Sequence, residues 1–152
     1  MSVVVSKIVE VFVYRMVDGR REFLLLKRSD AEIHPGIWSV CGGTMNQGEK
    51  AYETAVREMK EETGLIPVKL FKADTVNIFY EDIDDRVHIV PVFLAEADNS
   101  QVVLSHEHSE FAWTDLNTAH KLLHWNSWKT NIEFMDKCLG EEEFYKTLKQ
   151  II

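Results

Sequence analysis

Apolar and polar residues along the first part of the chain alternate in short runs, which is typical of β-strands. β-Branched residues dominate residues 3–17, and Asp18-Gly19 is a strong turn signal before the next apolar run. Residues 29–36 carry the loop signal His34-Pro35-Gly36, so the strands are expected on either side of them. We predict strands at residues 3–17, 23–28 and 37–41.

A helical period first appears after a pair of glycines. Tyr52, Ala55, Val56 and Met59 recur at spacings of three or four residues, which predicts a helix over residues 50–63 with these side chains on its buried stripe. Gly64 follows directly and suits the left-handed conformation that ends many helices.

Beyond this helix the pattern returns to strands and then ends in helices. Strands are expected at residues 68–80, 86–97 and 110–114, the first two joined by an acidic turn. From Leu116 to Leu139 the period is helical, and Gly140 interrupts it. This order predicts a mixed sheet covered by helices, of the α+β or α/β class. Three tryptophans are expected in the core: Trp113, Trp125 and Trp128.

Composition and charge narrow the classes of partner. The chain has 152 residues, which is enough for one well-buried core, so we expect a single domain over residues 1–152. Its net charge of −8 argues against binding to nucleic acid. It does not exclude an anionic substrate, because a bound divalent cation can reverse the local electric field. The chain has no apolar run of about 20 residues, and its start lacks a signal-peptide pattern. Cys41 and Cys138 are not in metal-ligand spacing, which suggests reduced thiols in a cytosolic protein. Because the apolar runs are short, we expect no membrane partner.

Three glutamates crowd into the last two turns of the predicted helix. With Glu58 at zero on a helical wheel, Glu61 and Glu62 fall about 60° to one side and about 40° to the other, so all three share one face. Like charges at these spacings repel, and the negative end of the helix dipole adds to the repulsion. Mg²⁺ or Mn²⁺ would remove it, because both ions bind carboxylate and carbonyl oxygens. A solvated glutamate face is more common, so the cluster alone does not decide.

Two neighbours would complete such a metal site. Arg57 can hold one carboxylate by a bidentate contact and fix its direction. The pair Gly42-Gly43 lets the backbone approach closely, so that a carbonyl there can join the metal shell.

The wider spacing around these glutamates decides between the two interpretations. Gly43 is followed after five residues by Glu49, and after seven more by the run REMKEETGL, which ends at Leu65. Seven fixed residue types at this spacing match by chance with a probability on the order of 10⁻⁶ or less. The stretch from Gly43 to Leu65 resembles a complete Nudix box.

The resemblance to the Nudix hydrolase family implies a fold, a reaction and a set of roles. The fold is an α/β/α sandwich with a mixed β-sheet between helices. The reaction is the attack of water on a phosphorus of a nucleoside diphosphate linked to another group, with Mg²⁺ as cofactor and Mn²⁺ as a substitute. By position, Glu61 and Glu62 correspond to metal ligands, together with the carbonyl of Gly42. Glu58 corresponds to either a ligand or the base, while Glu49 and Arg57 orient the cluster.

Substrate choice lies outside the box. The segment LSHEHSEFAWTDL resembles the matching stretch of asymmetric diadenosine tetraphosphate hydrolases and of Nudix enzymes acting on dATP or dihydroneopterin triphosphate. That resemblance implies that Glu107 reaches the metal site as a further catalytic residue. Zinc bound by His106 and His108 is a less favoured alternative.

Other residues are candidates for contacts with the substrate. Arg28 can meet a phosphate, and Trp38, Phe79 or Tyr80 can stack on a base, although core packing is the more common role of an aromatic. We therefore expect a small-molecule nucleotide substrate, which is a (d)NTP or a similar nucleoside or pterin triphosphate. A homodimer is a possible assembly of the protein.

Three alternatives remain beside this prediction. The first is a diadenosine polyphosphate hydrolase. The second is an isopentenyl diphosphate isomerase, because HPGIWSVCGG is similar to the stretch that supplies an active-site cysteine there, here Cys41. The third is a non-catalytic nucleotide-binding module. The complete box favours hydrolysis over the last two.

Overall fold

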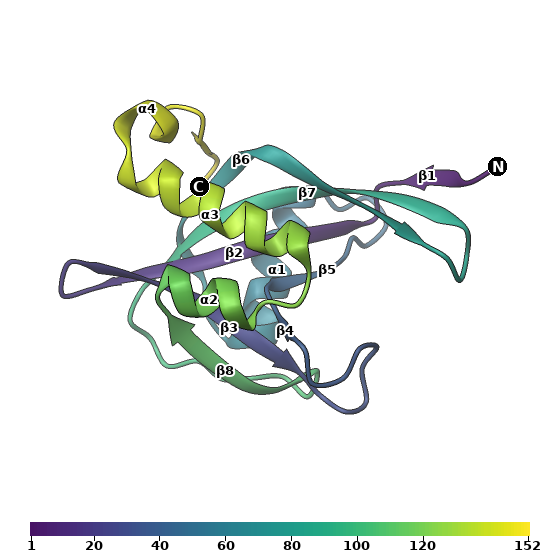
Figure 1. Ribbon diagram of the computed structural model, residues 1–152, viewed down its shortest axis with the longest axis horizontal. Coiled ribbons are helices and arrows are strands. Elements are labelled where there is room, and N and C mark those ends of the chain that lie inside the picture. Colours follow the sequence, from purple (N-terminus) through teal and green to yellow (C-terminus); the bar gives the residue numbers. More distant parts are fainter.

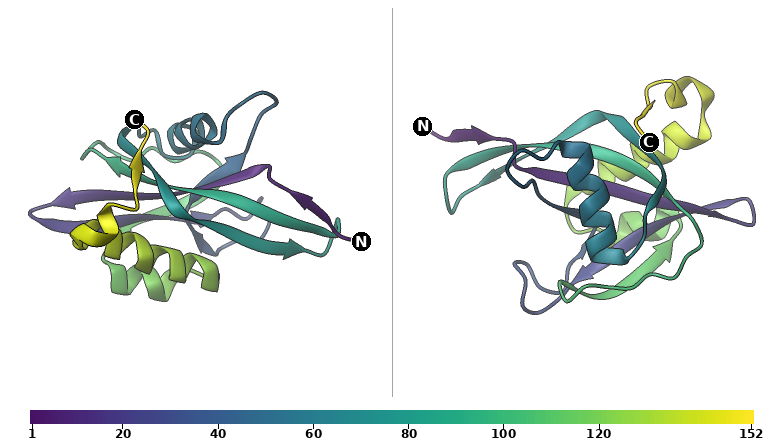
Figure 2. Two further views of the ribbon diagram at one scale, coloured as in Figure 1. Left: turned by 90° about the horizontal axis from the view of Figure 1, so that it is seen from above. Right: turned by 180° about the vertical axis from the view of Figure 1, so that it is seen from behind.

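The computed structural model describes residues 1–152 and shows one mixed sheet between two layers of helices (Figure 1). The edge-on view in Figure 2 places α1 on one face of the sheet and α2 and α3 on the other, which confirms the predicted α/β sandwich. No helix has both the length and the apolar character needed to span a membrane. The elements are β1 (Val3–Val5), β2 (Ile8–Val17), β3 (Arg20–Arg28), β4 (Trp38–Ser39), β5 (Cys41–Thr44), α1 (Ala51–Thr63), β6 (Pro67–Glu81), β7 (Arg86–Ala97), β8 (His108–Thr114), α2 (Leu116–Leu122), α3 (Asn126–Gly140), α4 (Glu142–Tyr145) and β9 (Lys149–Gln150).

The sheet has nine strands, and its centre is a parallel pair. The main order is β4-β3-β2-β7-β6-β9, in which β2 and β7 run parallel with Glu10 opposite Val92. β5 pairs with β2 alone, antiparallel, and Glu10 lies opposite Gly42 in that register. The β2–β5 pair therefore joins the centre of the sheet to the glycines that precede α1.

Alternation along β2 divides the core into two layers. Val9, Val11 and Val13 point toward α1, whose Ala55 and Met59 are fully buried against them. The next residues point the other way, toward α2 and α3, and their cluster includes Phe12, Tyr14, Phe23, Leu25, Leu94, Ile132 and Met135.

The predicted helix over residues 50–63 is confirmed to within one residue. Its first turn is capped by Glu53, whose carboxylate accepts a hydrogen bond from the backbone N–H of Lys50 (2.9 Å). Gly64 adopts φ = 74°, and its N–H donates to the carbonyl of Lys60. Only a glycine takes this left-handed conformation without strain, so the helix ends there.

Three sequence-based expectations need correction. The strand at residues 3–17 is interrupted at Ser6-Lys7, since β1 leaves β2 to pair in parallel with the far end of β7. The terminal helical stretch is divided after Leu122 into α2 and α3. Trp125, expected in the core, is 39% exposed, because it lies at the N-cap of α3 and packs edge-on against Trp128 and His34.

Candidate functional site

The carboxylates of α1 do not form a solvated face. Glu58 and Glu62 are 8% and 3% exposed, whereas the side chain of Glu61 is 57% exposed. Burying two carboxylates side by side is costly unless hydrogen bonds or cations compensate. The interpretation of these glutamates as an ordinary solvated surface is therefore wrong for Glu58 and Glu62.

Glu62 lies against the start of β5. Its Oε2 accepts a hydrogen bond from the N–H of Gly42 (3.1 Å). Burial raises the pKa of Glu62 to about 8, against the opposing effect of the Gly42 N–H, and the negative charges of Glu58 and Glu107 raise it further. At neutral pH, a cation that binds Glu62 would therefore have to displace a proton.

Glu58 packs directly against Gly43. A Cβ added at Gly43 would overlap the Glu58 carboxylate, so this close approach requires a glycine. Burial raises the pKa of Glu58, while the hydrogen bond and charge of Arg57 lower it. The two glycines thus have separate contacts, Gly42 with Glu62 and Gly43 with Glu58.

Arg57 supplies the positive charge of the cluster. Its Nε and Nη2 donate to the two oxygens of Glu49 (2.8 and 2.9 Å), so the expected bidentate contact is with Glu49. This contact lowers the pKa of Glu49 to about 2. The Nη1 of Arg57 donates to Glu58 (2.6 Å) and to Glu61 (3.1 Å), and its Nη2 also donates to the carbonyl of Thr44 (2.9 Å). None of these hydrogen bonds involves Glu62.

The loop before β8 brings Glu107 to the same place. The N–H of Val103 donates to the carbonyl of Thr63 (2.8 Å) and that of Ser105 to the carbonyl of Glu62 (3.3 Å), which fixes the loop to the C-terminal end of α1. The charge of Glu107 acts on both Glu58 and Glu62, raising the pKa of each. Five carboxylates and one guanidinium therefore gather in this region: Glu49, Glu58 and Glu61 contact Arg57, whereas Glu62 and Glu107 do not.

The residues fit a hard divalent cation by chemistry and charge. Carboxylate and carbonyl oxygens are the donors that Mg²⁺ and Mn²⁺ prefer, and the cluster has an excess of negative charge. No three acidic, histidine or cysteine side chains are arranged as the ligands of one ion, because Glu58 and Glu61 contact Arg57 and Glu62 contacts Gly42. Glu61 is the exposed member of this set, and its only hydrogen bond is with Arg57.

The histidines of the same loop do not form a zinc pair. His106 is exposed in the turn before β8, whereas His108 is buried within the strand. Burial lowers the pKa of His108 to about 4. The two imidazoles therefore do not share the strand face that joint zinc binding requires.

Cys41 is buried beneath the cluster. It is among the residues that pack toward α1, and burial raises the pKa of its thiol well above the ordinary value, with a further contribution from Glu62. A neutral, enclosed thiol is a poor candidate for the exposed acid of an isomerase.

The side chains of the candidate substrate residues make their contacts outside the carboxylates of α1. Arg28 donates to the carbonyl of Ile33 (2.6 Å) and pairs with Glu32 within the β3–β4 loop. Trp38 is half-buried and packs on the α2–α3 side of the sheet. Tyr80 is exposed on the β6–β7 hairpin, where its hydroxyl donates to Asp85 (3.1 Å). None of these contacts involves the carboxylates of α1, so the three substrate roles stay predictions.

Sequence reasoning missed one buried acidic residue. Glu10 lies in the middle of β2, and its Oε1 accepts hydrogen bonds from Asn77 (2.8 Å) and from the indole of Trp128 (2.9 Å). The signal in the sequence was a charged residue within the apolar run IVEVFV. Its partners could not be found by spacing, because they lie 67 and 118 residues away.

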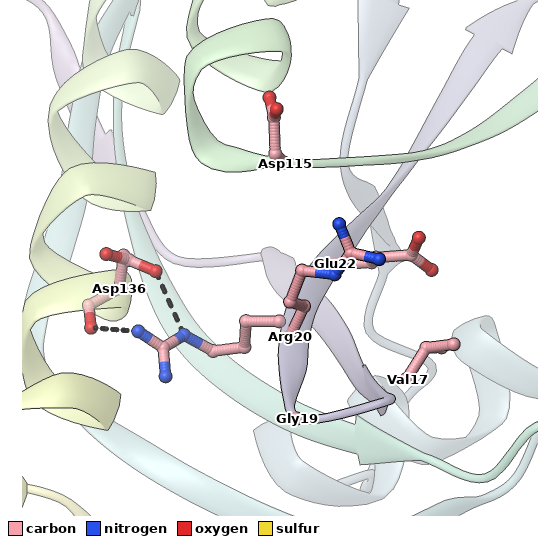
Figure 3. Close-up of a pocket in the computed structure, with 7 residues that line it drawn as sticks. Val17, Gly19, Arg20, Glu22, Asp115 and Asp136 are labelled. Atoms are coloured by element: carbon pink, nitrogen blue, oxygen red, sulfur yellow. Dashed lines mark hydrogen bonds and ion pairs between the residues drawn. The ribbon is translucent and has the colours of Figure 1, made fainter.

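A hollow at the opposite end of the sheet contains arginines together with acidic residues. Figure 3 shows it beside the β2–β3 turn, lined by Arg20, Arg21, Glu22, Asp115 and Asp136 among others. Arg21 donates to the Asp136 side chain (2.9 Å) and carbonyl (3.3 Å). Among its charged groups only Arg21 and Asp136 pair with each other, and none of the glutamates of α1 lines it.

The sequence is similar to enzymes that act on nucleotides. The NUDIX domain profile matches residues 7–138. The chain is 32% identical over 120 residues to the asymmetrical bis(5'-nucleosyl)-tetraphosphatase of Caenorhabditis elegans, covering 78% of this chain and 85% of that protein. It is 32% identical over 110 residues to the ADP-ribose pyrophosphatase of Methanocaldococcus jannaschii, covering 70% and 62%.

Solved structures agree with this similarity. The binary complex of a C. elegans Ap4A hydrolase aligns with a TM-score of 0.73 and 25% identity, covering 89% of this chain and 98% of that one. The MutT protein of Methanosarcina mazei aligns with a TM-score of 0.75 and 26% identity, covering 92% and 98%. The chain belongs to the NUDIX domain family and is a Nudix hydrolase.

Proposed function

We propose that this Nudix hydrolase uses Mg²⁺ to hydrolyse a phosphoanhydride bond of a nucleoside polyphosphate. The observation that carries the proposal is the burial of Glu58 and Glu62 beside one cation, Arg57, whose hydrogen bonds do not reach Glu62. A divalent cation supplies the missing positive charge, and oxygen donors of this kind suit Mg²⁺. Mn²⁺ has the same preference and is expected to substitute.

Each residue of the cluster has a separate task in this proposal. Glu58, Glu61 and Glu62 hold the metal together with the carbonyl of Gly42. When bound, Mg²⁺ lowers the pKa of a coordinated water and neutralises charge on the phosphate chain. Arg57 keeps the Glu58 carboxylate in position through its Nη1. The proton of the attacking water goes to Glu58 or to Glu107.

Two substrate classes are compatible with this site. A nucleoside or pterin triphosphate follows from the sequence, and 28% identity over 124 residues to the nucleoside triphosphatase NudI of Enterobacter supports it. A dinucleoside polyphosphate is supported by the higher identity, 32%, to the C. elegans tetraphosphatase. Product analysis separates them, because the first class yields a monophosphate with pyrophosphate and the second yields two nucleotides.

The decisive experiment removes the proposed ligands one at a time. Glu61→Gln and Glu62→Gln should each lower kcat by at least about 10²-fold at saturating Mg²⁺ while the fold is kept. Glu53→Gln is the matched control, since Glu53 lies on the same helix and is exposed, and it should keep the wild-type rate. Wild-type rates in both ligand variants would remove the metal-site assignment.

Metal binding also has a readout that does not depend on activity. An ion that binds only the folded site stabilises it by mass action, so millimolar Mg²⁺ should raise the melting temperature and a chelator should reverse the rise. A melting curve that responds to neither Mg²⁺ nor Mn²⁺ would argue against a metal site.

Glu107→Gln distinguishes the two candidates for the base. If Glu107 takes the proton, the variant should lose kcat and the acid limb of its pH–rate profile should change. If Glu107 is a ligand, higher Mn²⁺ should restore part of the rate. Unchanged kinetics would leave Glu58 as the base.

Three further expectations from the sequence stay proposals. We propose one domain over residues 1–152, a cytosolic location and a homodimer. Limited proteolysis, cell fractionation and sedimentation of the purified protein test them in turn, and a monomeric mass at micromolar concentration would exclude the homodimer.

A further inference from the structure

The buried carboxylate of Glu10 has one oxygen without a partner. Glu10 is only 7% exposed and lies on the α2–α3 side of β2, since its neighbours Val9 and Val11 point toward α1. Both of its hydrogen bonds, from Asn77 and Trp128, end on Oε1. Its Oε2 is buried and accepts no hydrogen bond. Such an acceptor costs stability, so a buried group of this kind needs an explanation outside the folding of the chain.

A purely structural role does not explain this arrangement well. An apolar residue at position 10 would continue the pattern of β2 and would avoid burying a charge. Burial indeed raises the pKa of Glu10, although the hydrogen bonds from Trp128 and Asn77 oppose the rise. These two donors also fix the carboxylate so that Oε2 is the oxygen left for a third donor.

The position of Glu10 connects it to the carboxylate cluster. Glu10 lies opposite Gly42 in the β2–β5 register, at a Cα separation of about 5 Å, and the N–H of Gly42 donates to Glu62. The two acidic groups therefore occupy opposite faces of the same strand pair. β5 has β2 as its only partner strand, so its other edge is not covered by the sheet. This uncovered edge is where the α1 side, with Glu62, and the Glu10 side of the strand pair meet.

Aromatic side chains border the same face. Trp38 packs on the α2–α3 side, and Trp125, largely accessible for a tryptophan, contacts Trp128 edge-on. Figure 1 shows the β6–β7 hairpin extending past the N-terminal end of α3, where Trp125 and Trp128 lie. Trp128 is the aromatic that contacts Glu10 directly, and Trp38 and Trp125 are the aromatic side chains of this region on which a heterocycle can stack.

We infer that Glu10 is a specificity-determining residue that accepts a hydrogen bond from the amino group of the substrate's heterocycle. The side-chain carbonyl of Asn77 is a second acceptor beside it, so an amino-substituted purine or pterin suits the pair better than a heterocycle without an amino group. The inference extends the proposed function, because it takes the ligand to be the nucleotide substrate of the same enzyme.

Paired substrates that differ only in the amino group test this inference. ATP is compared with purine riboside triphosphate, and GTP with inosine triphosphate. In the wild-type enzyme with Mg²⁺, kcat/KM should favour the amino member of at least one pair by about tenfold or more. Equal values within both pairs would overturn the inference even if all four nucleotides are hydrolysed.

Glu10→Gln replaces the unpartnered oxygen, Oε2, by a group of similar size but different hydrogen-bonding character. The amide oxygen must still accept from Asn77 and Trp128, so the amide nitrogen, a donor, replaces Oε2. The variant should lose the amino preference, with kcat/KM for the substrate without the amino group staying within about threefold of wild type. An equal loss for both members of a pair would show a structural role and overturn the inference. Glu96→Gln is the matched control, because Glu96 is a half-buried strand residue that accepts a hydrogen bond from Tyr14, and it should keep the preference.

A binding measurement separates this inference from the proposed function. Calorimetric titration of the metal-free protein with each nucleotide gives Kd values without hydrolysis. A tighter Kd for the amino member, lost in Glu10→Gln, would support the inference even if no nucleotide is hydrolysed. Equal Kd and equal kcat/KM values in the wild type would overturn it while leaving the proposed hydrolysis intact.

Discussion

Raising the pH from 6.5 to 8 should destabilise the metal-free protein, although most acidic proteins change little over this range. The pKa of Glu62 is raised to about 8 in the folded protein, against an ordinary value of 4.5. The folded state therefore holds a proton that the unfolded state has lost. Stability supplied by this proton is fully present below pH 4.5 and is lost as the pH rises through about 8.

The size of the expected loss of stability follows from the part of this pH range that the experiment covers. One pKa unit corresponds to about 1.4 kcal/mol, so the free energy of unfolding should fall by at most about 2 kcal/mol between pH 6.5 and pH 8. For a chain of this length that is a fall in melting temperature of about 4–8 °C. Below pH 6.5 the trend is mixed, because the pKa of His108 is lowered to about 4 and protonation of the unfolded state then costs stability as the pH falls.

The assay is urea denaturation at fixed ionic strength, with a chelator present, at half-unit steps of pH. Glu62→Gln should flatten the dependence, because glutamine keeps an acceptor for the N–H of Gly42 and has no proton to lose. Glu61→Gln is the control, since Glu61 is exposed, and it should keep the wild-type slope. Saturating Mg²⁺ should also reduce the slope. A stability that is constant or rises over this range, with the same slope in Glu62→Gln, would refute the reasoning.

The remaining predictions concern the residues around Glu62. Arg57→Lys should lower the free energy of unfolding by about 2 kcal/mol in urea, because lysine cannot keep the bidentate contact with Glu49 and reach Glu58 as well. Gly43→Ala should lower kcat at least about tenfold with an unchanged circular dichroism spectrum, because the new Cβ displaces the flexible end of Glu58 rather than the backbone. Cys41→Ala should lower the hydrolysis rate by less than about fivefold, since a metal-activated water needs no thiol, whereas a larger loss at unchanged thermal stability would favour an acid role for Cys41.

Local signals made α1 and its box predictable from the sequence. The apolar spacing of Ala55 and Met59 and the position of Gly64 each depend on neighbouring residues only, so the helix was predicted to within one residue. The wheel also placed the glutamates on one face. It could not show that Glu58 and Glu62 are buried, because their burial comes from β5, whose position depends on the long-range pairing of Gly42 with Glu10.

The incorrect placement of Trp125 and the failure to recognise Glu10 both arise from tertiary contacts that the sequence pattern does not show. Trp125 was expected in the core because tryptophan is usually well buried, but the break between α2 and α3 places it at a helix end. Glu10 was not recognised at all, since a single polar residue in a strand carries no periodic signal. Its significance depends on Asn77 and Trp128, which come from β6 and α3.

The hydrogen bonds of Arg57 explain why a proton and the proposed metal ion would compete for one particular carboxylate. Arg57 gives its bidentate contact to Glu49 and shares Nη1 between Glu58 and Glu61, so these three carboxylates already have a cation. Glu62 has only neutral partners, the N–H of Gly42 and the thiol of Cys41, and it is the most buried of the four. A proton satisfies it at low pH, and under the proposed function a divalent cation would do so once the proton has left. Of the three glutamates at the C-terminal end of α1, Glu62 is therefore the one that no cationic side chain contacts.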